Sequence, residues 1–479
     1  MAWPNPFRRH DENTRTCWGY TFQWTPEHKS REELEPLKYT YDKLADECLD
    51  AIDRISPPIK GELPRAHSEK PAPPRDLYAI LRDNADKDEK LGELWRQVNT
   101  IPDWVDWDQI KRGQEVFYRY GAPALNALGF ESLLGGMGAG RVVEVLARTG
   151  GFSTKVVRRR LFETTQHTLQ VTMSLDSIKP GGDGMASSVR VRLLHAAVRR
   201  RILKLAETRP EYYSVEKHGI PVNDLDCIGT IGTFSTLLVW LGLPRQGIYM
   251  RENEIVDYIA LWRLVAYYMG TPTEPFENPD KARKMLESIL TYEINPTHMS
   301  QVLANNIITG LENTPPTYAS RGFSEANAWW LNGKDLSMAL GIKKPSLYYR
   351  AVMLGYCIFM CSVCYTSRFL FLLDKLQIAY RRRVFWKFLM DEKTGLGKET
   401  KFDFKYLPGY DKTTELGASQ GRRGSFFGIE ILGLMGLAIP LVAAGGVSLA
   451  ASPFLRNIAI QAITKRLKDV QTVVKAVRA

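Results

Sequence analysis

The feature that most constrains the fold is a helical spacing of apolar residues that begins near residue 101 and continues through most of the chain. Apolar side chains recur every three or four residues, which places them on one face of a helix. Strand-like alternation is scarce, and no internal repeat is visible. The expected helices cover residues 139–148, 153–175, 185–208, 223–242, 253–270, 279–294, 298–312, 322–341 and 346–386. The sequence therefore predicts an all-α fold with one large helical domain.

Changes in composition divide the chain into four parts. Residues 1–100 are rich in proline and aromatic residues, so we expect an extended lead of irregular segments and short helices laid over the body. Residues 101–390 form the helical body. Residues 391–425 are polar and rich in glycine and lysine, which predicts a long loop. Residues 426–479 form a hydrophobic and then amphipathic helical tail.

The tail favours attachment to a membrane. Residues 431–452 carry no charge and are long enough to cross a bilayer core of about 30 Å. Their glycine, alanine and proline content leaves a buried or re-entrant helical hairpin as the alternative. The last stretch, 456–479, has six basic residues and one acidic residue, and its amphipathic pattern fits an anionic membrane surface. We expect a membrane-associated protein whose body faces the cytosol.

Charge and missing motifs exclude several classes of function. The formal net charge of +11 makes an anionic partner plausible, either a phospholipid headgroup, an acidic cofactor or a nucleic acid. Nucleic acid ranks last, because the arginines alternate with core-type aliphatic residues and no recognition module is present. The sequence also lacks the GxxxxGK[ST], HExxH, GxSxG and paired CxxC motifs.

One basic helix poses the central question about function. The segment VRVRLLHAAVRRRILKLA, residues 189–206, holds six Arg or Lys residues, one histidine and no carboxylate. Val191, His195, Val198 and Ile202 share one face of the expected helix. In one interpretation His195 is a core histidine on a helix whose other side is solvated. In the other, His195 is a ligand and the arginines face an anionic group that the protein does not supply.

Haem would explain both a ligand histidine and an anionic group that faces the arginines, as the second interpretation requires. A bare divalent ion needs three or four protein ligands, whereas haem needs one axial histidine because the porphyrin supplies the other donors. Haem also carries two propionates, which Arg192, Arg199 and Arg200 could neutralise. We therefore consider haem b, with His195 as its iron ligand, as the candidate cofactor.

The preceding helix adds candidate polar residues. Arg160, Glu163, Thr164 and His167 fall on one face of KVVRRRLFETTQHT. A buried face of this composition is costly unless a site uses it, whereas an exposed Arg160 paired with Glu163 or Thr164 would contribute little. Glu144, inside the apolar run RVVEVLA, is a candidate carboxylate in a dry setting that would raise its pKa.

Several ordered motifs together resemble one family. They are the segment from ESLLGGMGAGRVVEVLARTGG to RRRLFETTQHTLQV, then LLHAAVRRRI, then IPVNDLDCIGTIGTFS, and finally ALWRLVAYYMG. This series is similar to the latex-clearing rubber oxygenases and the fungal ER-bound oxygenases of the mpaB type. The resemblance covers roughly residues 100 to 385.

The resemblance implies an all-α fold and, from the rubber oxygenases, a b-type haem. The family's HxxxR pattern matches His195 and Arg199, which makes His195 the expected proximal ligand. Its RxxxT pattern matches Arg160 and Thr164 on the helix expected to face the distal side. Its distal glutamate, the proposed base, matches Glu144.

Other positions are implied less directly. A later arginine of the pattern falls at Arg321 in YASRGFSEANAWWL, and the NDLD stretch at 223–226 is expected to brace the haem helix. Some rubber oxygenases have a lysine just before the motif threonine that occupies the distal iron position. Here that residue is Glu163, so dioxygen, water or Glu163 itself is expected to face the metal.

Two functions remain in view. The first is a haem-dependent oxygenase that uses dioxygen to oxidise or cleave a C=C bond in a lipophilic, prenyl or terpenoid-like substrate, with Glu144 as base. Membrane association fits such a substrate, and the resemblance implies the endoplasmic reticulum as its location. The second is a non-catalytic, membrane-attached helical protein that binds a lipophilic ligand. In that case His195 would have no special role.

Overall fold

The computed structural model describes residues 11–57, 75–402, 413–419, 421–422, 424 and 428–439. The predicted all-α class is confirmed, and in the described residues the strands form a single two-stranded antiparallel hairpin that pairs Thr14 with Gln23. The lead holds β1 (Thr14–Cys17), β2 (Tyr20–Gln23), α1 (Arg31–Leu34), η1 (Glu35–Lys38), α2 (Lys43–Ile55), α3 (Leu77–Asn84) and α4 (Glu89–Asn99).

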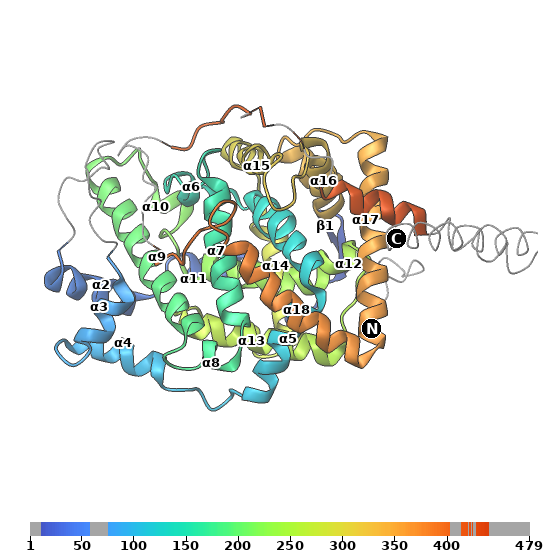
Figure 1. The fold of residues 1–479 in the computed structure, drawn as a ribbon. Helices are drawn as coiled ribbons and strands as arrows, with labels where there is room; N and C mark the ends of the chain where they lie inside the picture. The colour runs from blue at the N-terminus through green and yellow to red at the C-terminus, as the bar shows by residue number, and fades with distance from the viewer. Residues whose placement is uncertain are drawn as a thin grey trace, which may run out of the picture.

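The body is a bundle of helices with several short irregular turns (Figure 1). Its elements are α5 (Trp107–Ala127), η2 (Leu128–Leu134), η3 (Gly135–Gly138), α6 (Gly140–Ala147), α7 (Val157–Thr172), α8 (Leu175–Ile178), α9 (Asp183–Thr208), α10 (Val215–His218), α11 (Asp224–Phe234), η4 (Leu238–Gly242), α12 (Leu243–Arg245), α13 (Glu252–Tyr268), η5 (Glu274–Phe276), α14 (Pro279–Tyr292), α15 (His298–Leu311), α16 (Arg321–Ala339), α17 (Leu347–Phe369) and α18 (Phe371–Leu389). Two of the turns, η2 and η4, are π-helical.

The centre of the bundle is the close packing of α5 against α13. Gly113 makes this approach possible, because a Cβ there would collide with the backbone carbonyl oxygen of Asp257. Further along α5, Gly121 breaks the helix with a φ of 25°. The side chain of Arg381 from α18 fills the space at this break, where its Cδ lies 2.7 Å from the position a Cβ would take. The kink in α5 thereby positions α18.

The stretch 346–386 was predicted as one helix and is instead two. The helices α17 and α18 meet at Leu370, whose φ of −105° and ψ of 97° are extended. The apolar run SRFLFLL gives no sequence sign of this break. The fold-back is secured by Asp374, which accepts hydrogen bonds from Arg119 of α5 at 2.8 and 2.9 Å. A buried tertiary ion pair therefore overrides continuous helical periodicity.

The lead does more than cover the body, because α2 supplies an acidic face to α9. Its carboxylates recur at helical spacing, so they lie on one side of the helix. They are Asp42, Asp46, Asp50 and Asp53. Arg192 binds Asp42 with two hydrogen bonds, Arg199 binds Asp46 at 2.8 Å, and Arg200 binds Asp50 and Asp53. In Figure 1, α2 lies alongside α9 at one end of the molecule.

This ion-pair ladder corrects the sequence interpretation of the basic helix. The arginines of α9 were expected to face an anion that the protein does not supply, but the protein supplies the carboxylates itself. The sequence interpretation missed them because the partners lie about 150 residues upstream, in a segment read as an irregular lead.

The C-terminal tail is described only at its start. The helix Glu430–Ile439 crosses α17 at glycines, and a Cβ on Gly355 would meet the backbone of Gly433 while one on Gly436 would meet that of Gly355. The remainder of the predicted 431–452 segment and the amphipathic stretch 456–479 lie outside the described residues. Among described residues, the stretch 224–245 and α17 are each long and apolar enough to cross a membrane, although the first is mostly buried in the body.

Removing one carboxylate of the ladder should destabilise the protein. Asp46→Ala leaves the buried Arg199 guanidinium without its charge partner, and we expect the free energy of unfolding to fall by about 3 kcal/mol. The matched control is Asp50→Ala on the same helix, where the ion pair to Arg200 is exposed and the expected loss is below about 1 kcal/mol. Urea unfolding measures both values. Equal losses in the two variants would contradict the ranking.

Candidate functional site

A large cavity lies in the helical body. Its volume is about 830 Å³, within the range of about 300–1,000 Å³ that is typical of ligand sites. Most of the lining side chains are apolar. The polar side chains that interrupt this lining include Glu131, Ser132, Arg141, Arg160, Thr164, Thr165, His167, Thr168, His195, Asp226, Arg245 and Glu293. The cavity therefore suits an apolar ligand that meets polar groups at a few points.

His195 faces this cavity from α9. Its ring nitrogens make no hydrogen bond to any residue that the structure describes. Burial, together with the positive charge of Arg199, lowers the pKa of His195 from its usual value to about 3. The imidazole is therefore neutral near pH 7, with a lone pair available to a ligand on the cavity side.

His167 on the neighbouring helix α7 provides a useful contrast. It also lines the cavity, and burial lowers its pKa to about 4. Unlike His195, it has a protein partner, because its Nδ1 lies 3.0 Å from Ser187 Oγ. Of the two histidines, His195 is the one whose ring is left for a ligand to use.

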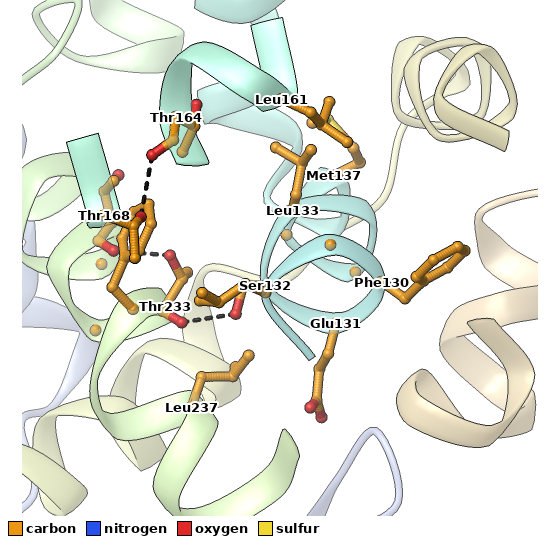
Figure 2. Close-up of a pocket in the computed structure, with 18 of the residues that line it drawn as sticks. Phe130, Glu131, Ser132, Leu133, Met137, Leu161, Thr164, Thr168, Thr233 and Leu237 are labelled. Carbon is orange, nitrogen blue, oxygen red and sulfur yellow. Dashed lines mark hydrogen bonds between the residues drawn. The ribbon is translucent and has the colours of Figure 1, made fainter. Parts of the chain in front are cut away.

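A row of side chains on α7 also lines the cavity. Arg160, Thr164 and Thr168 are spaced four residues apart, and the hydroxyls of the two threonines donate to backbone carbonyls one turn earlier, at 3.2 and 3.0 Å. Figure 2 shows Thr164 and Thr168 opposite the turn that carries Ser132 and Leu133. Each hydroxyl oxygen keeps acceptor capacity toward the cavity. The sequence prediction for Arg160 and Thr164 therefore agrees with their placement.

The two carboxylates predicted for the site lie elsewhere. Glu144 accepts from Arg148 at 2.7 Å and does not line the cavity, whereas its neighbours Val145 and Leu146 do. Glu163 is buried between Arg159 and Arg160, at 3.4 and 3.5 Å, and does not line the cavity either. The structure thus does not support Glu144 as the base in the cavity or Glu163 as a group facing a metal. Both carboxylates turn to arginines on their own helical face.

Three predicted cofactor-binding arginines are also outside the lining. Arg192 and Arg199 bind the carboxylates of α2, as described above. Arg321 begins α16, where it donates to Glu325 at 2.8 Å and to Thr309 Oγ1 at 3.3 Å. None of the three lines the cavity. Arg192 and Arg199 can therefore affect the site only by holding α9 in position.

The stretch 223–226, which was predicted to brace the helix that carries His195, lies next to the residue that accepts a hydrogen bond from that helix. Asn223 caps α11 by accepting from the backbone N–H of Asp226 at 3.0 Å, and Val222 just before it accepts from Arg199 at 2.8 Å. Asp226 and Glu293 both lie against Arg141, at 2.7 and 3.0 Å. This buried cluster ties α6, α11 and α14 together at one wall of the cavity.

The sequence interpretation missed a buried carboxylate that does line the cavity. Glu131 sits in the π-helical turn η2, and its Oε1 accepts from Arg245 at 2.8 Å. Its Oε2 has no hydrogen-bond partner in the described residues. Burial, opposed by Arg245, raises the pKa of Glu131 to about 8. In Figure 2 its side chain points away from Thr164.

Nothing in the local pattern singles out Glu131. It stands in GFESLLGG, which reads as an ordinary helix end, and a π-helical turn has no simple sequence mark. The residue belongs to the first motif of the family resemblance, but no role was assigned to it there.

Comparison with known proteins decides the family. The model of the "ER-bound oxygenase mpaB/B'/Rubber oxygenase, catalytic domain" matches residues 119–360, from within α5 to within α17. This chain belongs to the rubber oxygenase/mpaB family. The resemblance read from the sequence is confirmed.

Two known proteins are similar to this chain. A rubber oxygenase from Streptomyces sp. (strain K30) is 24% identical over 247 residues, which cover 50% of this chain and 54% of the relative. The chain thus spans about half the length of that relative. The structure of latex clearing protein LCP in the closed state superposes with a TM-score of 0.54 at 18% identity, over 72% of this chain and 91% of that one. This match shows a shared fold.

Within the described residues of this family member, no group of three or more His, Cys, Asp or Glu side chains is placed to hold a metal ion. A cofactor that brings its own equatorial donors needs only one protein ligand. The unpartnered imidazole of His195 beside a large cavity fits that requirement.

The two cavity histidines should make the protein less stable in acid. Their pKa values of about 3 and 4 lie below the unfolded value of about 6.5, so between about pH 4 and 6 the unfolded chain binds more protons. As the pH is lowered through this range, the free energy of unfolding should decrease by up to about 1.4 kcal/mol per pH unit for each histidine.

The variant His167→Gln isolates one of these contributions. Urea unfolding from about pH 4.5 to pH 7 should show a shallower dependence on pH for the variant. Groups such as Glu131 titrate in both proteins, so the difference between the two curves belongs to His167. Parallel curves would show that His167 is not held neutral by burial.

Proposed function

We propose that this chain is a haem-dependent oxygenase that oxidises or cleaves a C=C bond in a lipophilic, prenyl or terpenoid-like substrate. Membership of the rubber oxygenase/mpaB family supports the reaction class. The observation that supports haem as the cofactor is the state of the His195 ring. The ring is neutral, faces a cavity of about 830 Å³ and has no hydrogen-bond partner among the described residues. A bound haem would supply the iron at which dioxygen is activated.

The residues of the cavity suggest how the cofactor would be held. One ring nitrogen of His195 would bind the iron of the cofactor. Arg160 is the best placed to neutralise a propionate, because its one carboxylate contact within the described part of the chain, to Glu163, is long at 3.5 Å. The other cavity arginines, Arg141 and Arg245, are held by carboxylates at 2.7 and 2.8 Å. This assignment replaces Arg192 and Arg199 as the anion-binding residues.

The lining suggests the substrate class. Side chains such as Leu133, Leu161 and Leu237 surround the space, so an extended hydrocarbon chain would displace water from apolar walls. Thr164 and Thr168 supply hydroxyl oxygens at one wall, where they could orient a water molecule by accepting a hydrogen bond from it. Apolar walls also exclude bulk water from reactive species.

Glu131 replaces Glu144 as the candidate proton carrier. It is a carboxyl group in the cavity lining, it has a free Oε2, and its pKa of about 8 is near the working range of a general acid or base. A proton taken up at Oε2 would be stabilised by the surrounding burial, while Arg245 holds Oε1 in place.

Association with a membrane, at the endoplasmic reticulum and with the body in the cytosol, remains part of the proposal. Its support is the uncharged run 431–452 and the amphipathic stretch 456–479 of the sequence. A lipophilic substrate partitions into lipid, so a membrane-associated enzyme would meet it at high local concentration. No nucleic-acid partner is proposed.

Loss of His195 tests the cofactor. The purified full-length protein should show a Soret absorption band, and His195→Ala should lose it because the axial ligand is gone. The matched control is Glu144→Gln, which lies outside the cavity and should keep the band. A colourless wild-type protein that still binds a hydrocarbon would instead favour the non-catalytic lipid-binding function. A full band in folded His195→Ala would refute the ligand assignment.

The turnover rates of two variants distinguish between the two candidate bases, Glu131 and Glu144. Glu131→Gln should lower the rate of dioxygen uptake with a polyisoprene oligomer by about 10²- to 10⁴-fold, while Glu144→Gln should change it by less than about threefold. Both variants should keep the Soret band. The reverse order of rates would return the role of base to Glu144.

A further inference from the structure

Exposed apolar side chains are concentrated on the last helices of the described chain. Of the eighteen large hydrophobic residues that are exposed in the described chain, twelve belong to α17, α18 or the helix 430–439, and a thirteenth, Leu370, joins α17 to α18. They are Leu347, Tyr348, Leu354, Phe369, Leu370, Phe371, Leu372, Leu373, Leu376, Tyr380, Phe388, Leu434 and Met435. Soluble proteins rarely expose an apolar patch of this kind without a partner. We call these thirteen residues the α17–α18 face.

The exposed apolar residues are most closely spaced where α17 ends and α18 begins. Residues 369–373 are all exposed, with Phe369 at 76% and Leu372 at 74%. Leu376 and Tyr380 continue the exposed row along α18. The one acidic residue of the turn, Asp374, points inward to Arg119 instead. The corner therefore presents an apolar edge with no exposed carboxylate in it.

The same elements are strongly basic. Residues 343–390 contain nine Lys or Arg residues, and Asp374 is the one carboxylate among them. Six of the basic residues are exposed: Lys343, Lys344, Arg350, Lys375, Arg383 and Lys387. The ammonium of Lys375 lies 4.4 Å from the ring centre of Phe371, so its charge stays beside the apolar edge. Apolar side chains bordered by cations are typical of surfaces that bind anionic lipid.

We propose that the α17–α18 face docks this protein on an anionic lipid bilayer. The charge pattern favours phospholipid headgroups, because the exposed cations have no acidic counterpart in 343–390. The course of the chain favours the same side. The helix Glu430–Ile439 packs on α17 through Gly433 and Gly436, and from residue 431 on it forms the first part of the uncharged run 431–452. Figure 1 shows it crossing α17, at the end of the molecule opposite α2.

One element joins this face to the cavity. Phe388 of α18 is 54% exposed and also lines the cavity, beside Phe385 and Leu389. Ile429, just before the helix 430–439, lines the cavity as well. If the proposed function holds, a hydrocarbon substrate would leave the bilayer and enter the cavity beside Phe388 without crossing water. The docking itself does not depend on the oxygenase proposal.

Vesicle binding tests the docking face in the full-length protein. The variant Leu372→Glu/Leu376→Glu should lower the partition coefficient on vesicles of phosphatidylcholine with about 30% phosphatidylserine by about tenfold or more. The matched control is Leu416→Glu, a leucine of similar exposure, 63% against 67% for Leu376, outside the face. This control should bind as the wild type does. Binding of the double variant equal to the wild type would overturn the proposal.

A variant that removes two positive charges tests independently whether the bilayer must be anionic. Arg383→Gln/Lys387→Gln should weaken binding to the anionic vesicles severalfold and leave binding to pure phosphatidylcholine unchanged, because only the electrostatic attraction is removed. An equal loss on both vesicles, or no loss on either, would contradict an anionic partner.

Two further measurements separate the alternatives. A wild-type dimer that becomes a monomer in Leu372→Glu/Leu376→Glu without change in vesicle binding would assign the face to self-association and overturn the lipid proposal. The Soret band should be the same in wild type and in both double variants, because none of the changed residues lines the cavity. Failure of haem binding would therefore leave the docking result intact.

Discussion

The ion pairs between α2 and α9 are the constraint on which the rest of the site depends. Arg199 is almost fully buried, so it is tolerated only because Asp46 and two backbone carbonyls meet its guanidinium. These contacts clamp α9 from the side of the lead and leave the side of His195 to the cavity. Arg192 and Arg199 lie three residues before and four residues after His195, so their ion pairs fix the part of α9 that carries the imidazole ring. A histidine held in this way keeps its orientation without any hydrogen bond of its own.

The chemistry of the cavity follows from which polar groups have partners. His167 is satisfied by Ser187, and Arg141 is satisfied by Asp226 and Glu293, so these groups shape the walls. His195 and Oε2 of Glu131 have no hydrogen-bond partner in the described part of the chain. Other buried polar atoms of the described residues, such as Tyr268 Oη and Arg75 Nε, also have no hydrogen-bond partner, so His195 and Glu131 are candidates for a ligand because they also line the cavity.

The helices were predictable because periodicity is a local property, and α9 was expected at 185–208 against an observed 183–208. The site was only partly predictable. His195, Arg160 and Thr164 line the cavity because their helices turn those faces inward. Glu144 and Glu163 do not line it, because nearby arginines on their own helices hold their carboxylates away from the cavity. The catalytic and ligand roles expected for these residues stay predictions. The partners of Arg192 and Arg199 were missed because pairing across about 150 residues is a tertiary property.

The glycine crossing between α17 and the helix 430–439 has a mechanical consequence. Backbones that touch at Gly355, Gly433 and Gly436 interlock without long side chains, so the crossing resists sliding. It lies at the opposite end of the molecule from the α2–α9 ladder (Figure 1). Tension applied through the tail would be borne by α17 before it reached α9. The ion pairs of α9 beside His195 are thereby separated from a force applied at the helix 430–439.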